Sequence, residues 1–388
     1  MIYINDYSSI SSVGNNKTAV NKALGETNID FLTKRDDLLV SKNVSFFGVV
    51  ESQLPDLSNY KSHFTRNNQF LAQCIEQIKD KIDYFKTKYP KDRIGVVMGT
   101  STSGLEETEH ELERYLKDNK LNKDFNYHYA ELGDSSMFMA EYLDIEGPCY
   151  TISTACSSSS RALVSAKRML ECDLVDVVIA GGADTLCQVP INGFDSMGVL
   201  SYEHCMPFSK DRHGINIGEG GGLMILSKEP SSLALLGVGE SSDAYHVSSP
   251  DPSGEGAISA IKMALKNANL KIDDIGYINM HGTSTKLNDA MESTAVAKYF
   301  GTNTPCSSTK HLTGHTLGAA GILEATFLCN ILENNLDLPV QDFSKSPKDP
   351  ELLECGIIDK AIKSKTAYMM SNSFAFGGNN TSIIIGKV

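Results

Sequence analysis

The sequence has 388 residues, of which 41% are hydrophobic and 21% are charged, a balance typical of a globular protein with one large or two medium domains. Its formal net charge of −13 at pH 7 argues against a protein that binds nucleic acid through a basic surface. No window approaches about 18 uninterrupted apolar residues, so we expect no membrane span.

The first 123 residues predict alternating helices and strands. Helices are expected at residues 18–24, 67–89 and 105–123, and strands at residues 43–50 and 93–98. The second of these strands ends in the small-residue loop 99–104. A phosphate cradle is possible in this loop, but no Lys follows it as a P-loop requires, so we favour a tight turn.

Cys156 stands where a short strand is expected to lead into a helix. The strand covers residues 149–153, and apolar residues recur at helical spacing from Ser160 to Leu170. Free N–H groups and the positive end of the helix dipole would lower the pKa of this thiol and stabilise an oxyanion beside it. The alternative is a buried cysteine that only packs against small neighbours.

Glycines mark the next two segments. The apolar strand 175–180 is expected to end in a turn at Gly181 and Gly182. The glycines at 218–222 precede an apolar strand and do not link a strand to a helix, so we interpret them as tightly packed backbone and not as a nucleotide loop. Residues 228–232, which contain Pro230, are the predicted boundary between an N-terminal half (1–232) and a C-terminal half (233–388).

The C-terminal half repeats the alternation of strands and helices, which predicts an α/β layered fold. Strands are expected at residues 233–238, 275–280, 367–370 and 381–385, and helices at 256–267, 290–300 and up to Leu332. Nine scattered cysteines without a CxxC pair, and an N-terminus without the regions of a signal peptide, predict reduced thiols in a cytoplasm. The nine histidines form no HExxH pattern, so we expect no catalytic metal.

Four features stand at strand ends or in loops, where active sites of α/β folds tend to lie. They are Cys156, His281, Lys310 with His315, and the stretch 374–380. Each has a structural alternative, such as a satisfied buried histidine, a surface lysine or a glycine β-turn. One cysteine and two histidines beside glycines nevertheless make a nucleophile with acid/base partners plausible, and this chemistry points to acyl transfer at a thioester or ester.

A series of motifs carries a resemblance to a known family. They occur in this order: Thr154 to Ser159, Pro207-Phe208 through Asp211-Arg212, Gly218 to Gly220, Asp243 to His246, His281 to Thr285, Ser308 to Lys310, Gly314 to Gly321, and Phe374 to Asn379. In combination they resemble the β-ketoacyl-acyl carrier protein synthases, which are condensing enzymes of the thiolase superfamily. The resemblance covers most of the chain from about residue 90 onward, and the usual opening strand of the family is degraded to residues 3–12.

The resemblance implies a five-layer αβαβα fold of two similar halves, usually as a dimer. It implies that an acyl group moves from the phosphopantetheine of an acyl carrier protein to Cys156. Malonyl-carrier protein then loses CO₂, and the enolate attacks the acyl-Cys156 thioester to give 3-oxoacyl-carrier protein. No cofactor beyond the carrier's phosphopantetheine is expected.

The resemblance also implies roles for individual residues. His281 and His315 would donate hydrogen bonds to the malonyl thioester oxygen, and Lys310 and Glu324 would pair to hold them electrostatically. The N–H groups of Cys156 and Phe376 would form the other oxyanion hole. The remaining residues are expected to contact the substrate or to control access: Thr283 and Thr285 at the pantetheine arm, Phe376 as a gate, and Phe374 as a pocket or packing residue.

Some residues depart from the family pattern. Lys286 and Leu287 replace a proline and a small or apolar residue near the pantetheine entry, and Ala375 and Asn379 replace the commonest residues of the last motif. The weak match of the first 90 residues suggests a specialised pathway of the polyene type. Some such ketosynthases pair with a chain-length-factor subunit, so a homodimer and a heterodimer both remain open.

Three other functions remain as alternatives. A non-catalytic subunit that shapes a chain-length tunnel would lose the nucleophile, whereas Cys156 is present. A degradative thiolase would want a second cysteine near the C-terminus, and residues 374–380 contain none. A Ser/His hydrolase would want a Gly-x-Ser-x-Gly frame, which the serines near Cys156 lack. For the acidic carrier protein we expect a local basic patch around Lys210, Arg212 and Lys286.

Overall fold

The computed structural model describes residues 1–25, 30–123 and 125–388. The strands in these residues are β1 (Tyr3–Ser11), β2 (Thr33–Arg35), β3 (Ser45–Phe47), β4 (Ile94–Gly99), β5 (Cys149–Ile152), β6 (Val177–Asp184), β7 (Gly220–Ser227), β8 (Leu233–Ser242), β9 (Ile275–Asn279), β10 (Cys306–Ser307), β11 (Tyr368–Phe374) and β12 (Asn379–Lys387). The α-helices are α1 (Lys17–Gly25), α2 (Arg66–Gln77), α3 (Lys79–Lys88), α4 (Leu105–Asp118), α5 (Asp134–Leu143), α6 (Ser158–Glu171), α7 (Gln188–Ser196), α8 (Glu255–Ala268), α9 (Lys286–Phe300), α10 (Lys310–Thr313) and α11 (Ala320–Asn334).

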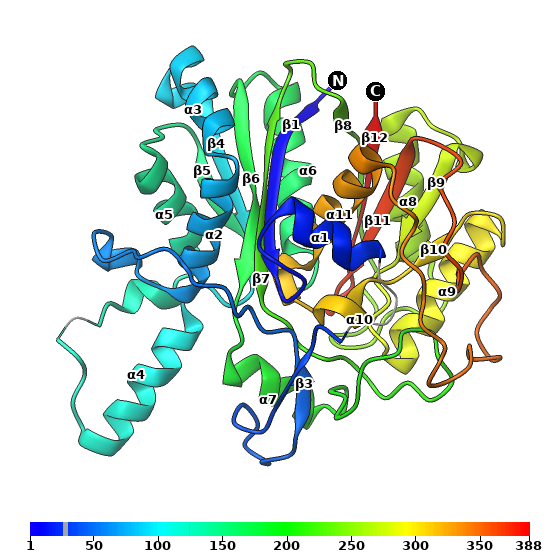
Figure 1. Ribbon diagram of the computed structural model, residues 1–388, viewed down its shortest axis with the longest axis horizontal. Coiled ribbons are helices and arrows are strands. Elements are labelled where there is room, and N and C mark those ends of the chain that lie inside the picture. The colour runs from blue at the N-terminus through cyan, green and yellow to red at the C-terminus, as the bar shows by residue number, and fades with distance from the viewer. Residues whose placement is uncertain (26–29, 124) are drawn as a thin grey trace.

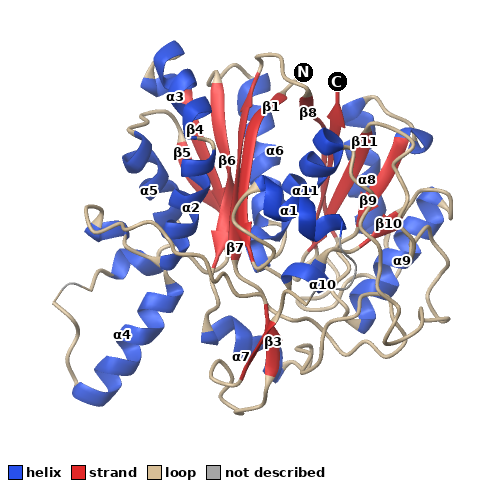
Figure 2. Ribbon diagram, viewed as in Figure 1, coloured by secondary structure: helices blue, strands red, loops and turns tan. Residues whose placement is uncertain are grey.

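Ten of the described strands form two groups that meet at one narrow seam, and β2 pairs with β3 in a separate sheet. One group has the order β1-β7-β6-β4-β5, and the other has the order β8-β12-β11-β9-β10. Among the described residues, strand pairing joins the groups only between β1 and β8, at Tyr3 with Ala234 and at Ile4 with Leu233. Figure 2 shows the two groups of strands separated by helices. Because the seam is so short, side-chain packing between the groups must hold them in register.

Helices cover both faces of each group, so the expected order of five layers is confirmed. Helices α2, α3 and α5 pack on the outer face of the first group, and α8 and α9 pack on the outer face of the second. Helices α6 and α11 lie between the groups (Figure 1). A layered arrangement of this kind buries both faces of each sheet, which explains why strands such as β6 and β7 are buried at every position.

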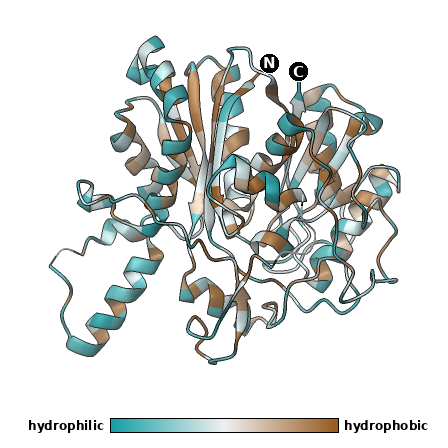
Figure 3. Ribbon diagram, in the orientation of Figure 1, coloured by the Kyte–Doolittle hydropathy of each residue, from teal (hydrophilic) through white to brown (hydrophobic). Residues whose placement is uncertain are grey.

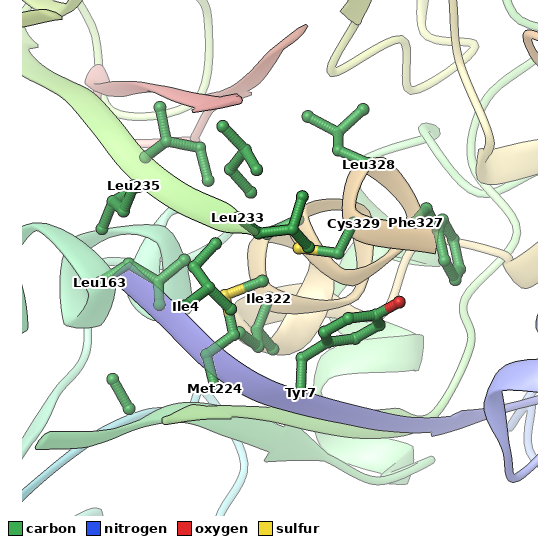
Figure 4. Packing of buried hydrophobic residues seen from close by; sticks show 14 of the residues in the cluster. Ile4, Tyr7, Leu163, Met224, Leu233, Leu235, Ile322, Phe327, Leu328 and Cys329 are labelled. Carbon is green, nitrogen blue, oxygen red and sulfur yellow. The ribbon is translucent and has the colours of Figure 1, made fainter. Parts of the chain in front are cut away.

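The central layer carries the largest hydrophobic cluster. Figure 4 shows how Ile4 of β1, Leu163 of α6 and Ile322 of α11 meet between the two groups of strands, with Leu233 of β8 close to them. All four side chains are at most 2% exposed. Complete burial of such a side chain contributes about 1.5–3 kcal/mol, so this cluster fixes α6 and α11 against each other.

Hydropathy follows the layers. Figure 3 shows hydrophobic residues on the strands of both groups and mostly hydrophilic residues on α3, at the outside of the molecule. Among the described residues, no helix has the length and hydrophobicity needed to cross a membrane. The division of the chain at residues 232 and 233 stays a prediction, although the segment does connect β7 to β8.

Three predicted helices have different bounds in the structure. The expected helix 67–89 is two helices, because Ile78 leaves the helical region (φ −121°, ψ 17°), and its N–H bonds to the carbonyl of Ile75. The expected helix 105–123 ends at Asp118, where Asn119 adopts a left-handed conformation (φ 50°). Helix α9 begins at Lys286, four residues before the predicted start.

The predicted glycine turn at residues 181–182 is wrong. Both glycines lie inside β6, where a Cβ on Gly181 would lie 2.0 Å from the carbonyl oxygen of Gly222 on β7. A Cβ on Gly182 would lie 2.0 Å from the carbonyl oxygen of Gly99 on β4. Gly181 and Gly182 therefore allow neighbouring strands to pack closely. This is the role that we expected for the glycines at 218–222.

The variant Gly182→Ala tests this packing. We expect it to lower the free energy of unfolding by about 2–3 kcal/mol, because β4 and β6 would have to move apart. Urea denaturation measures the change. The control is Gly193→Ala in α7, where the added Cβ has no described atom within 4 Å beyond its chain neighbours and the backbone of its own helix, and alanine is favoured over glycine by up to about 1 kcal/mol. Equal stability of the two variants would contradict the packing role.

Candidate active site

Cys156 lies in the turn between β5 and α6 and is 6% exposed. The preceding Ala155 has a positive φ of 51°, a conformation that costs a non-glycine residue free energy. Ser158, the first residue of α6, stabilises this turn, because its N–H and its hydroxyl both donate to the carbonyl of Ala155, at 3.1 and 2.6 Å. The strained turn presents the thiol beside the N-terminus of α6.

Two histidines from the C-terminal half face this thiol. Nε2 of His315 is 3.0 Å from the Cys156 sulfur. The ring of His281 packs edge-to-face on that of His315, with centroids 5.3 Å apart. The sulfur and one ring nitrogen of each histidine all lie within 4.8 Å of one another. The structure thus brings three of the predicted site residues together from both halves of the chain.

Both histidines are neutral at ordinary pH. Burial lowers the pKa of each imidazole well below its usual value, and the Lys310 ammonium lowers it further. Neither ring nitrogen of His281, nor Nδ1 of His315, has a hydrogen-bond partner within the described chain. Neutral imidazoles with free nitrogens can donate hydrogen bonds to an oxygen that gains negative charge.

The expected low pKa of the Cys156 thiol is wrong. Burial raises its pKa to about 11, and this effect outweighs the N–H groups of Phe376 and Cys156 and the Lys310 ammonium, all of which lower it. The resting group is therefore a thiol. His315 is the group that can accept its proton during the attack on a thioester.

Lys310 and Glu324 form a buried ion pair behind the histidines. Nζ of Lys310 contacts Oε1 of Glu324, and both side chains are almost completely buried. Lys310 begins α10 and Glu324 lies in the second turn of α11, so the pair connects the two segments that flank His315. A buried charge needs a partner of this kind.

Two buried carboxylates near His281 were not predicted from the sequence. Glu292 accepts hydrogen bonds from the backbone N–H groups of His281 and Gly282, both at 2.8 Å. Asp289 accepts hydrogen bonds from the N–H groups of Ser284 and Phe208, at 3.0 and 2.8 Å. Both carboxylates lie on α9. The only signal for them in the sequence was their position shortly after the motif 281–285.

Phe376 lies at the rim of the site and is half-buried. Its backbone N–H faces the Cys156 sulfur, and its ring packs on Phe194 of α7 with centroids 5.8 Å apart. Gly377 and Gly378 follow it with φ angles of 83° and 73°, which favour glycine. Phe374, by contrast, is 3% exposed and packs in the core of the C-terminal half.

The predicted pantetheine contacts lie close to each other at the start of α9. The hydroxyls of Thr283 and Thr285 are 3.0 Å apart, and both residues are buried. The two residues that depart from the family pattern come directly afterwards. Lys286 and Leu287 are both exposed, so they can meet a partner without disturbing the core.

Arg212 does not belong to an exposed basic patch. It is 3% exposed, and its guanidinium contacts Asp349 at 2.5 Å and Asp289 at 3.5 Å. Lys210 and Lys286 are exposed, and so is Lys345. Two hydrogen bonds bring the segments that carry these lysines together. The N–H of Lys210 donates to the carbonyl of Pro347, two residues after Lys345, and the side chain of Arg212, two residues after Lys210, donates to the carbonyl of Lys286. Lys210, Lys286 and Lys345 are called the basic patch below.

The loop 99–104 is a tight turn that holds a carboxylate of the chain itself. Oδ1 of Asp184 accepts hydrogen bonds from the N–H groups of Ser101 and Thr102, both at 2.7 Å, and from the hydroxyls of Thr100 and Thr102. The N–H and hydroxyl groups that could bind a phosphate are therefore occupied. This agrees with the sequence, in which no lysine follows the loop as a P-loop requires.

The site as a whole combines a thiol and two neutral imidazoles, one of which contacts the thiol and can accept its proton. A thioester carbonyl placed beside Cys156 would meet the N–H groups of Cys156 and Phe376. The same thiol and imidazoles are donor types that zinc uses, so the expected absence of a catalytic metal stays a prediction.

Two family models match the chain. The model described as "Beta-ketoacyl synthase, N-terminal domain" matches residues 65–231, and "Beta-ketoacyl synthase, C-terminal domain" matches residues 233–343. Among curated proteins, the chain is 31% identical to "Nodulation protein E" of Rhizobium meliloti (strain 1021), and the match covers 76% of each chain. It is 29% identical to "3-oxoacyl-[acyl-carrier-protein] synthase 1" of Buchnera aphidicola subsp. Baizongia pistaciae (strain Bp), over 97% of each chain.

Solved structures are similar over the whole chain. One of them is a ketosynthase, ApeO, in complex with its chain length factor, ApeC, from Xenorhabdus doucetiae. The TM-score is 0.98 and the identity is 48%, and the match covers all of this chain and 98% of the other.

The raised pKa of Cys156 predicts how alkylation depends on pH. Because the thiolate is the reactive form, the rate of alkylation by iodoacetamide is expected to rise about tenfold for each unit between about pH 7 and pH 9. Peptide mass spectrometry separates this thiol from the exposed Cys172. The rate for a cysteine peptide in the same reaction should begin to level off above about pH 8.5. The same levelling off for Cys156 would contradict a pKa that is raised by burial.

Proposed function

Because the chain belongs to the β-ketoacyl synthase family, we propose that Cys156 carries the acyl group and that His281 and His315 serve the decarboxylation step of its condensation reaction. The chain is a condensing enzyme of the acyltransferase class. The observation that carries the assignment of residues is the contact between the Cys156 thiol and Nε2 of His315, beside the neutral ring of His281.

In the first half-reaction, an acyl group moves from a carrier thioester to Cys156. His315 Nε2 takes the thiol proton as the sulfur attacks the carbonyl carbon, and the N–H groups of Cys156 and Phe376 stabilise the oxyanion. The carbon–sulfur bond to the carrier breaks, and the carrier thiolate takes the proton back from His315. The products are acyl-Cys156 and the free carrier thiol.

In the second half-reaction, a malonyl thioester loses CO₂. His281 and His315 donate hydrogen bonds to the thioester oxygen, where negative charge develops as the enolate forms. The enolate carbon then attacks the carbonyl carbon of acyl-Cys156, a carbon–carbon bond forms and the carbon–sulfur bond to Cys156 breaks. The Cys156 thiolate takes one proton from solvent and returns to the thiol. The product is a 3-oxoacyl thioester, and loss of CO₂ drives the reaction without a metal or nucleotide cofactor.

The ion pair of Lys310 with Glu324 influences the protonation state of the two histidines in both half-reactions. An ammonium beside the two imidazoles keeps them neutral, so that each ring has one N–H donor and Nε2 of His315 can accept the thiol proton. The carboxylate of Glu324 fixes the position of this ammonium. Phe376 and the two glycines after it would admit the carrier arm, and Thr283 and Thr285 would contact that arm.

We further propose that the substrates arrive on the phosphopantetheine of an acidic acyl carrier protein in the cytoplasm. The basic patch supports this proposal, because Lys286 lies directly after Thr285 at the start of α9. Electrostatic attraction of this kind accelerates encounter and selects partners.

A second subunit is proposed as well. Strand β5 ends the sheet order with one unpaired edge, and Tyr150 on it is 37% exposed. An unpaired edge strand favours pairing with another chain. The 48% identity to a ketosynthase in complex with its chain length factor favours a heterodimer of the same kind over a homodimer. A specialised pathway of the polyene type is proposed from the sequence alone.

The proposed function is tested by the stoichiometry of the reaction. Incubation with an acyl-carrier protein and a ¹³C-carboxyl malonyl-carrier protein should release one labelled CO₂ for each 3-oxoacyl product. The reaction is run with and without a co-expressed partner subunit. Release of CO₂ without a condensed product, or product that retains the label, would refute the decarboxylative condensation.

Two histidine variants separate the half-reactions. His281→Ala should lower decarboxylation of malonyl-carrier protein by about 10²-fold, the usual effect of removing one oxyanion donor, while acylation of Cys156 stays within about threefold. His315→Ala should lower both rates, because its Nε2 contacts the sulfur. Intact mass reports acylation, and CO₂ release reports decarboxylation. The exposed His213→Ala is the matched control, and equal profiles for the two site variants would contradict the assignment.

Charge reversal tests the basic patch. Lys286→Glu combined with Lys345→Glu should raise the KM for acyl-carrier protein by about tenfold, and the KM for a free acyl-pantetheine should not change. Steady-state kinetics with the two donors measures the difference. Lys266→Glu on the outer helix α8 is the control for net charge. An unchanged KM for the carrier protein would remove the patch from the docking site.

A further inference from the structure

Asp184 is a buried carboxylate at the end of β6, and it connects segments from both halves of the chain. It is fully buried. Its Oδ1 accepts the four hydrogen bonds from Thr100, Ser101 and Thr102 described above, and its Oδ2 accepts a hydrogen bond from the N–H of Ala319 at 2.9 Å. The first group of donors follows β4, and Ala319 lies just before α11.

On the N-terminal side, these contacts lead to Cys156. A Cβ on Gly99 would lie 2.4 Å from the backbone of Ser158 and Ser159, so the start of the loop packs directly on the first turn of α6. That turn holds the strained Ala155 immediately before Cys156. The position of the loop therefore determines where the thiol stands.

On the C-terminal side, the contacts lead to His315. A Cβ on Gly318 would lie 2.9 Å from Oδ2 of Asp184 and 2.8 Å from the hydroxyl of Ser101. Leu317, two residues after His315, has a positive φ of 49°, a second strained position in the site. Strain of this kind persists only where neighbouring groups hold the backbone, and Asp184 accepts a hydrogen bond from Ala319, two residues after Leu317.

We propose that Asp184 is a positioning residue for acyl transfer, which fixes the Cys156 sulfur at 3.0 Å from His315 by fastening the two strained turns to one carboxylate. The proposal rests on the proposed function of the site. His281 and His315 both belong to the C-terminal half, so Asp184 does not set their mutual geometry. Loss of its link should therefore impair acylation of Cys156 more than decarboxylation.

The variant Asp184→Asn breaks the link selectively. The four donors around Oδ1 force the amide oxygen to that side, so the amide NH₂ must face the N–H of Ala319. A donor that faces a donor loses the hydrogen bond and leaves both groups unsatisfied. The loop 99–104 keeps its acceptor, and only the connection to the His315 segment is lost.

The kinetic test compares the two half-reactions in D184N. We expect the rate of Cys156 acylation at saturating donor to fall about 10- to 100-fold, the KM for the donor to stay within about twofold, and decarboxylation to stay within about threefold. Asp134→Asn is the matched control, a buried carboxylate that binds His63 and Asn68 instead. Acylation that stays within twofold, or falls in equal proportion with decarboxylation, would overturn the proposal.

A second readout does not depend on activity. In ¹⁵N-histidine-labelled protein, Cys156→Ala should shift the His315 Nε2 resonance in the wild-type background and should leave it unshifted in D184N. An equal shift in both backgrounds would refute the positioning role even if no donor acylates the enzyme. Should D184N fail to fold, Thr102→Val removes one donor to Oδ1, and a fall of about 3- to 10-fold confined to acylation is expected.

Discussion

The close approach of two helix N-termini is the constraint on which the rest of the structure depends. Helices α6 and α11 meet between the two groups of strands, where a Cβ on Gly321 would lie 1.9 Å from the Ser160 hydroxyl. The N–H of Ile322 also donates to the Ser159 hydroxyl at 2.9 Å. Because Cys156 precedes α6 and His315 precedes α11, this contact places the thiol beside the imidazole. The five-layer arrangement places α6 and α11 next to each other, and the small residues at their N-termini allow the close approach.

Burial determines the protonation states of Cys156 and of the two histidines. It raises the pKa of the Cys156 thiol to about 11 and lowers the pKa of both histidines. A thiol and a neutral imidazole in contact are inert at rest, and they become reactive when a thioester supplies a carbonyl for attack. The buried pair of Lys310 and Glu324 reinforces this state, because its ammonium disfavours a second positive charge on either ring.

The alternation of strands and helices predicted an α/β layered fold, and the strand ends and glycine-flanked motifs predicted Cys156, His281, Lys310 and His315, because these are local signals. The five layers and the roles of Glu324 and Phe376 followed only from the resemblance to the condensing enzymes. It could not predict effects that depend on distant contacts. Gly181 and Gly182 were interpreted as a turn, since glycine serves turns and close packing alike. The direction of the Cys156 pKa depends on burial, which no motif records. Asp184 was missed because its partners, Thr102 and Ala319, lie 82 and 135 residues away in the chain.

Intact mass after incubation with a panel of acyl-carrier proteins tests the central claim most directly. The account predicts that the wild-type protein, alone or with its partner subunit, gains the mass of the acyl group, and that Cys156→Ala gains none. The chains that are accepted would also outline the pocket. Acylation that persists in Cys156→Ala, or no acylation of the wild-type protein with any donor and partner, would contradict a nucleophilic role for this thiol.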